Sequence, residues 1–227
     1  MGSNVFSVAA CESAKQHLVI YGRRMGPDRL SIGTSGNLSI RVGDVVAITP
    51  GSSSYDELEI DDICVVALDG TKISGDRNVS SEWPMHSSIY AKTDAQAIVH
   101  THSPEVVALS ATCNELPAIH YSIAKLGGHV RVVDYARFGS EKLARSVIVA
   151  LESRNTVILQ NHGAVSYGSS IAQAYDRALM LEWLAGVYRM AIQYGQPRIL
   201  SQRELDEVTA EVIRRRYGDS EAPEVSA

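Results

Sequence analysis

The stretch Ala97-Ile98-Val99-His100-Thr101-His102-Ser103-Pro104 contains a short β-prone run that leads directly into the start of a helix. Residues 97–101 are typical of a strand, and serine followed by proline is typical of a helix N-terminus. Side chains two residues apart on a strand point to the same face of a sheet. A single histidine at a strand end is most often a hydrogen-bonded structural residue. The pair His100 and His102, however, predicts a face on which both imidazoles bind one metal ion.

Regular elements continue on both sides of this stretch. Before it, the pattern predicts an amphipathic helix over 8–21, hairpins over 38–42 with 45–49 and over 63–68 with 71–74, and a helix over 82–92. After it, the pattern predicts helices over 140–152 and 171–194 and strands over 156–160 and 164–167. This order predicts a single three-layer α/β/α domain over residues 1–217, around a largely antiparallel or mixed central sheet. The small, acidic residues 218–227 predict a disordered tail.

Composition narrows the class of protein. A length of 227 residues with 45% hydrophobic residues suits one well-packed domain. The net charge is -5 and the 21 basic residues form no basic run, so we expect neither nucleic acid nor membrane as a partner. No apolar stretch approaches the roughly 20 residues of a membrane helix, and no leader pattern opens the chain, which predicts a soluble cytoplasmic protein. The three scattered cysteines argue against a disulfide framework or a structural zinc site.

A third histidine follows another strand. Asn161-His162-Gly163 comes directly after the apolar run 157–159, so His162 reaches the same sheet edge if the strands are neighbours. Three histidines with one open position are typical of a catalytic zinc site, because structural sites are normally closed by four protein ligands. Gly163 permits a close approach of the backbone. The other four histidines are isolated and are interpreted as packing residues or as residues that support the ligands.

The segment Ser80-Ser81-Glu82-Trp83-Pro84 predicts a helix start in which the serines cap the helix and the proline occupies its first turn. Helix starts gather unpaired N–H groups, so Ser80 and Ser81 are candidates for binding a phosphate. Glu82 has two interpretations. It is either a favourable charge in the first helical turn or a proton carrier beside the metal.

Two further loops are rich in glycine and small polar residues. These are Gly33-Thr34-Ser35-Gly36-Asn37 and Thr49-Pro50-Gly51-Ser52-Ser53-Ser54, and both can present N–H groups to an anion. Loops of this composition are often simple turns, and each alone supports phosphate binding only weakly. Together they favour an anionic substrate that is bound without a basic patch.

These residues together resemble the class II aldolase and adducin head domain family over nearly the whole chain. The landmarks occur in order: Gly33-Thr34-Ser35-Gly36-Asn37, Ile48-Thr49-Pro50, Ser80-Ser81-Glu82-Trp83, Val99-His100-Thr101-His102, Ala118-Ile119-His120-Tyr121, Phe138-Gly139, His162-Gly163 and Tyr217-Gly218. Each is weak alone, but the ordered set is specific. The resemblance implies that His100, His102 and His162 bind Zn²⁺, with Co²⁺ or Mn²⁺ as alternatives, and that Glu82 both approaches the metal and transfers protons.

The same resemblance assigns the substrate contacts. It places the phosphate on Gly36, Asn37, Ser80, Ser81 and the turn at Gly51-Ser52. In that turn the family commonly has threonine or serine followed by glycine, whereas this chain has the reverse order.

Three aromatic residues match the family at the aldehyde end of the substrate. Tyr121 resembles a tyrosine that enters a neighbouring subunit's site as a proton donor, and Phe138 and Tyr217 resemble residues that line the aldehyde end. Buried aromatic residues and a terminal tyrosine also occur without any catalytic role.

The implied reaction is reversible cleavage of a ketose 1-phosphate, first of all L-fuculose 1-phosphate, to dihydroxyacetone phosphate and a short aldehyde, L-lactaldehyde. A bound zinc ion would act as a Lewis acid. Glu82 would move the proton at the carbon next to the carbonyl, and Tyr121 the proton on the aldehyde oxygen. The resemblance also implies a cyclic homotetramer with active sites between subunits.

Other functions stay open. Aldolases for 5-deoxyribulose or methylthioribulose 1-phosphate share the glutamate, whereas the related pentulose-phosphate 4-epimerases usually carry aspartate at the position of Glu82. A non-catalytic binding protein of the adducin type would keep the fold and lose the metal ligands. All three histidines are present here, which counts against it.

Overall fold

A nine-stranded sheet runs through the part of the protein that the computed structural model describes, residues 7–215. Its strands are β1 (Asn37–Val42), β2 (Val45–Ile48), β3 (Cys64–Ala67), β4 (Lys72–Ser74), β5 (Ala97–Thr101), β6 (Glu115–Leu116), β7 (Val130–Val133), β8 (Thr156–Leu159) and β9 (Gly163–Gly168). They lie in the order β4-β3-β2-β1-β5-β9-β8-β7-β6. All neighbours are antiparallel except β7 and β8, which are parallel, so the sheet is mixed as predicted.

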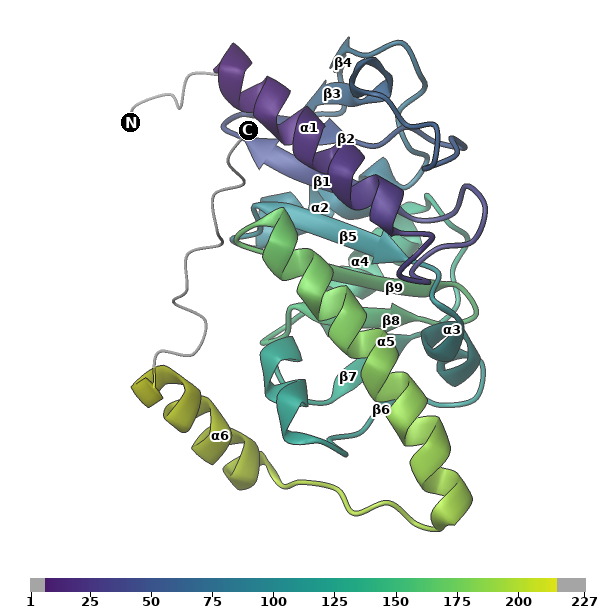
Figure 1. Ribbon diagram of the computed structural model, residues 1–227, viewed down its shortest axis with the longest axis vertical. Helices are drawn as coiled ribbons and strands as arrows, with labels where there is room; N and C mark the ends of the chain where they lie inside the picture. The colour runs from purple at the N-terminus through teal and green to yellow at the C-terminus, as the bar shows by residue number, and fades with distance from the viewer. Residues whose placement is uncertain (1–6, 216–227) are drawn as a thin grey trace.

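Helices cover both faces of the sheet (Figure 1). The helices are α1 (Val8–Arg24), α2 (Trp83–Lys92), α3 (Pro104–Ser110), α4 (Glu141–Ala150), α5 (Ile171–Tyr194) and α6 (Gln202–Arg215). Helices α1 and α5 lie on one face, and α2 and α4 lie on the other. The expected three-layer α/β/α domain is therefore confirmed. None of the described helices is long and apolar enough to cross a membrane.

The alternation of side chains along β5 fixes where the site forms. Ile98 packs into the apolar cluster beneath α2 and α4, whereas the next residue, Val99, packs into the cluster beneath α1 and α5. His100 therefore shares the face of Ile98 and points towards the side of α2. Asn37 on β1 is the direct partner of His100 in the sheet, so its side chain lies on the same face.

The predicted elements agree closely with the observed ones. Both hairpins are present, and the long helix has the predicted bounds. The structure adds elements that the sequence pattern did not predict: strands β6 and β7, helix α6, and two short 3-10 helices over Ile60–Asp62 and Tyr121–Leu126. The predicted domain end at 217 and the predicted disordered tail 218–227 lie outside the described residues.

Candidate active site

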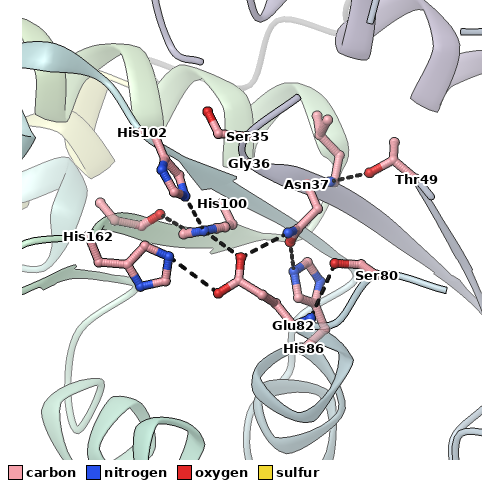
Figure 2. A network of polar contacts seen from close by, with 12 residues as sticks. Ser35, Gly36, Asn37, Thr49, Ser80, Glu82, His86, His100, His102 and His162 are labelled. Carbon is pink, nitrogen blue, oxygen red and sulfur yellow. Dashed lines mark hydrogen bonds and ion pairs between the residues drawn. The ribbon is translucent and has the colours of Figure 1, made fainter. Parts of the chain in front are cut away.

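Four titratable side chains meet at the end of β5 (Figure 2). His100 and His102 lie at the end of that strand, His162 lies between β8 and β9, and Glu82 precedes α2. One nitrogen or carboxylate oxygen of each residue lies within 4.8 Å of those of the other three. The structure therefore brings together the four predicted metal-site residues.

The three imidazole rings surround a common point. Their centroids are 4.8 to 4.9 Å apart in pairs, and the rings are nearly perpendicular to one another. His100 Nδ1 lies 2.9 Å from the Ala164 carbonyl oxygen, which can only accept, so this nitrogen carries the proton. His100 Nε2 therefore faces the other ligands, 3.0 Å from His102 Nε2 and 2.7 Å from Glu82 Oε2. A backbone partner of this kind is the usual support for a metal-bound histidine.

The Glu82 carboxylate provides the test of whether a cation fits. Oε2 accepts a hydrogen bond from Asn37 Nδ2 at 3.1 Å. Oε1 is buried, lies 3.4 Å from His162 Nε2 and has no hydrogen-bond partner among residues 7–215. A buried carboxylate oxygen without a donor is costly, and a cation among the three imidazoles would satisfy it. The donor set therefore fits a divalent metal ion.

The charges of these groups also suit metal binding. Burial lowers the pKa of His102 to about 3, with help from the charges on His100 and His162, and it lowers the pKa of His162 to about 4. Burial alone would raise the pKa of Glu82, but the charge and hydrogen bond of His100 outweigh burial and hold that pKa below its usual range. At neutral pH His102 and His162 thus present imidazole lone pairs beside an ionised carboxylate. Burial alone would lower the pKa of His100, but the charge and hydrogen bond of Glu82 outweigh burial and raise that pKa.

Glu82 occupies the cap position of α2 but does not cap the helix. The expectation that Ser80 and Ser81 cap α2 is wrong, because the residue at the cap is Glu82, and its side chain makes no capping hydrogen bond. Ser80 Oγ accepts instead from the Glu82 N–H, at 3.3 Å. Because the carboxylate is turned towards the histidines, a helix-stabilising charge does not account for its position.

A pocket of about 280 Å³ opens beside the four side chains. All six residues predicted to bind phosphate line it, namely Gly36, Asn37, Gly51, Ser52, Ser80 and Ser81. Among the described residues, no lysine or arginine lines this pocket. Any anion bound there would depend on N–H groups and hydroxyls, as the sequence predicts.

The reversed turn keeps a left-handed backbone. Ser52, at the position where the family commonly has glycine, has a φ of 58°. Such a conformation is unfavourable by roughly 1–2 kcal/mol for a residue with a Cβ atom. The order Gly51-Ser52 therefore exchanges the two residue types, but the backbone at Ser52 keeps the left-handed conformation that a glycine would favour. Gly36 also has a positive φ, and a Cβ there would lie 2.7 Å from the His100 carbonyl oxygen.

Asn37 and His86 lie beside Glu82 and form a polar support for its carboxylate (Figure 2). The Asn37 side chain is engaged on both sides, by Glu82 and by His86 Nε2, which lies 2.5 Å from Asn37 Oδ1. His86 is fully buried, and the sequence pattern did not single it out among the isolated histidines. Its spacing could have indicated that His86 lies near Glu82, because it follows Glu82 by four residues, about one helical turn.

The predicted aromatic residues are distributed differently. Phe138 lines the pocket together with Tyr135. Tyr121 does not line it: the residue is 55% exposed, stacks on His120 and borders a groove against α6. Tyr217 lies outside the described residues. The roles of Phe138, Tyr121 and Tyr217 stay predictions.

Gly163 holds β9 close to β5 beside His162. A Cβ atom at this position would lie 2.0 Å from the Thr101 carbonyl oxygen. We expect Gly163→Ala to lower the free energy of unfolding by about 3 kcal/mol, because the backbone must move to relieve the overlap. Urea denaturation of the metal-free protein measures this change.

Gly26→Ala is the matched control, because no heavy atom lies within 4 Å of a Cβ built there. Its expected change is within about 1 kcal/mol. Equal stability of the two variants would contradict the close approach at Gly163.

Comparison with known proteins agrees with this geometry. The family model described as Class II Aldolase and Adducin N-terminal domain matches residues 16–189. The chain belongs to this family. A solved structure described as L-fuculose 1-phosphate aldolase matches with a TM-score of 0.86 at 34% identity, covering 93% of this chain and 100% of that one. The protein therefore has the class II aldolase fold.

Curated relatives of this class II aldolase include enzymes that are named for different ketose 1-phosphates. A 5-deoxy-D-ribulose 1-phosphate aldolase of Bacillus thuringiensis serovar kurstaki is 36% identical over 198 residues, which cover 86% of this chain and 93% of the relative. An L-fuculose phosphate aldolase of Escherichia coli K12 is 35% identical over 179 residues, which cover 78% of this chain and 83% of the relative.

Proposed function

We propose that the protein is a metal-dependent class II aldolase that reversibly cleaves a ketose 1-phosphate to dihydroxyacetone phosphate and a short aldehyde. The observation that carries the proposal is the convergence of Glu82 with His100, His102 and His162 beside a pocket lined by N–H groups and hydroxyls. The proposed metal is zinc, because imidazole nitrogens and a carboxylate are ligands that zinc favours, and cobalt or manganese are the alternatives.

The proposed mechanism divides the work among residues of this chain. When bound, the metal ion supplies a Lewis acid that polarises the substrate carbonyl. The serine and glycine loops at Ser80-Ser81, Gly36 and Gly51-Ser52 hold the phosphate. Glu82 takes up and returns the proton at the carbon next to the carbonyl, since its ionised carboxylate lies beside the pocket.

Tyr121 has a proposed role in another subunit. We propose a homotetramer with active sites between subunits, in which Tyr121 handles the proton on the aldehyde oxygen of a neighbouring site. The exposure of Tyr121 and its absence from the lining of the pocket in its own chain support this role.

Two sugars are the leading substrates. The names of the relatives point to L-fuculose 1-phosphate and 5-deoxyribulose 1-phosphate at nearly equal identity. Both sugars end in a methyl group at the carbon farthest from the phosphate. The rings of Phe138 and Tyr135 line the pocket and offer an apolar surface to that end.

A product assay across a panel of ketose 1-phosphates tests the proposal. The metal-loaded protein is incubated with each sugar phosphate, and dihydroxyacetone phosphate is measured together with the remaining sugar. Release of dihydroxyacetone phosphate from at least one deoxy-ketose 1-phosphate is expected. An epimerised pentulose phosphate without cleavage would instead support the epimerase, and no turnover of any sugar would support a binding protein.

A further inference from the structure

A buried row of polar side chains leads from Glu82 into the core. From Asn37, which donates to Glu82 Oε2, it continues through His86 to Ser39 Oγ, 2.7 Å from His86 Nδ1, and then to Tyr90 Oη, 2.8 Å from Ser39 Oγ. Each of these side chains is at most 4% exposed. The proposed mechanism gives no task to any of these four side chains.

The ionised end of the row sets the direction of every hydrogen bond. A carboxylate only accepts, so Asn37 must turn its NH₂ group towards Glu82 and its oxygen towards His86. His86 Nε2 then donates. Burial lowers the pKa of His86 to about 3, so the ring is neutral and its Nδ1 accepts from the Ser39 hydroxyl. Tyr90 in turn donates to Ser39.

The opposite direction leaves two groups unsatisfied. With the proton on His86 Nδ1, Ser39 would donate to Tyr90, and the Tyr90 hydroxyl hydrogen would have no acceptor, since Ser39 is the only hydrogen-bond partner of this hydroxyl within residues 7–215. At the other end, Asn37 would present its oxygen to the Glu82 carboxylate at a distance of 3.1 Å. Two facing acceptors repel, and a buried donor without a partner is costly. The geometry therefore selects one tautomer.

We infer that His86 is a positioning residue for Glu82: Ser39 and Tyr90 hold it in the Nε2–H form, and it locks the Asn37 amide so that Asn37 holds Glu82 Oε2 beside His100 Nε2 and Oε1 lies beside His162 Nε2. The inference rests on the proposed function in one respect, because the proposed function is what gives Glu82 a task. The tautomer and the amide orientation follow from the hydrogen bonds themselves.

Nitrogen-15 NMR of the metal-free protein at pH 7.5 tests the tautomer without any turnover. The histidine signals that disappear in His86→Gln belong to His86. We expect its Nε2 to be protonated and its Nδ1 to be bare. A protonated Nδ1 with a bare Nε2 would overturn the inference, whether or not the protein cleaves a sugar phosphate.

Variants test the consequence for the site. His86→Leu removes the donor to Asn37, and we expect kcat and the affinity for added Co²⁺ each to fall by roughly 10- to 100-fold, with KM changed far less. His86→Gln keeps an N–H group that can reach Asn37, and it should recover most of both losses. Ser39→Ala removes the donor to Nδ1 and the acceptor of the Tyr90 hydroxyl but leaves His86 in place, and it should give a smaller loss in the same direction.

The exposed residue His17 supplies the control, because His17→Gln changes a histidine far from this row. It should leave kcat and the Co²⁺ affinity unchanged. If His86→Leu does not fold, Ser39→Ala and the parent NMR spectrum still decide. Unchanged kcat and Co²⁺ affinity in a folded His86→Leu protein would overturn the inference. If His86→Leu does not fold, unchanged values in Ser39→Ala would overturn it. A loss in His86→Gln equal to that in His86→Leu would also overturn it.

Discussion

Glu82→Gln is expected to lower the turnover of ketose 1-phosphate cleavage by roughly 100- to 10,000-fold, the range typical of losing general acid/base catalysis. The amide has nearly the shape of the carboxylate, and its oxygen can still accept from Asn37. It cannot accept and return a proton at neutral pH. The three histidines remain, so the variant should keep its fold and its metal. Steady-state kinetics and elemental analysis of the purified variant measure both outcomes.

Exchange of the carbon-bound proton of dihydroxyacetone phosphate with solvent separates proton transfer from bond cleavage. In Glu82→Gln this exchange should slow in parallel with turnover. Glu12→Gln is the matched control, because Glu12 is an exposed carboxylate on α1. A Glu82→Gln protein that kept metal, lost cleavage and still exchanged the proton at the parent rate would contradict the assignment of Glu82 as the base.

Removing the phosphate from the substrate is expected to lower kcat/KM nearly as much as Glu82→Gln lowers turnover. Hydrogen bonds to a charged group contribute about 1.5–3 kcal/mol each, so the loss of two lowers kcat/KM by a factor on the order of 100 to 10,000. Binding energy at the remote phosphate also helps to hold the reacting end. The comparison is between L-fuculose and L-fuculose 1-phosphate, or the corresponding pair for the sugar that the panel assay identifies.

Ser81→Ala locates the effect in the pocket. It should lower kcat/KM for the phosphorylated sugar and leave the slow reaction of the free sugar nearly unchanged, because Ser81 lines the proposed phosphate end. Similar catalytic efficiency for the sugar with and without phosphate would remove the support for this anion site.

Local patterns were sufficient to predict much of the fold and the centre of the site. The alternation along β5 places His100, and His102 follows the last strand residue, Thr101, with its ring against that of His100. The short link between β8 and β9 places His162 beside them. Short turns with glycine predicted both hairpins: Gly43 and Asp44 link β1 to β2, and Asp69 and Gly70 lie in the longer link between β3 and β4. These features depend on neighbours in the sequence, which is why they can be predicted from it.

Features that depend on distant contacts were harder to predict. Strand β7 has only four residues, including Arg131, and gains its place by pairing with β8, more than 20 residues away. His86 on α2 contacts Asn37 and Ser39, which lie on β1 and precede it by 49 and 47 residues. Helix α6 did leave a signal, since Ser201 and Glu204 exchange the hydrogen bonds of a capping box.

The metal content of the purified protein tests the central claim most directly. Elemental analysis should find about one divalent metal ion per chain, activity should disappear on chelation, and changing both His100 and His102 to alanine should remove the metal. Full activity in metal-free protein, or an undiminished metal content in the double variant, would contradict the claim that these histidines form a catalytic metal site.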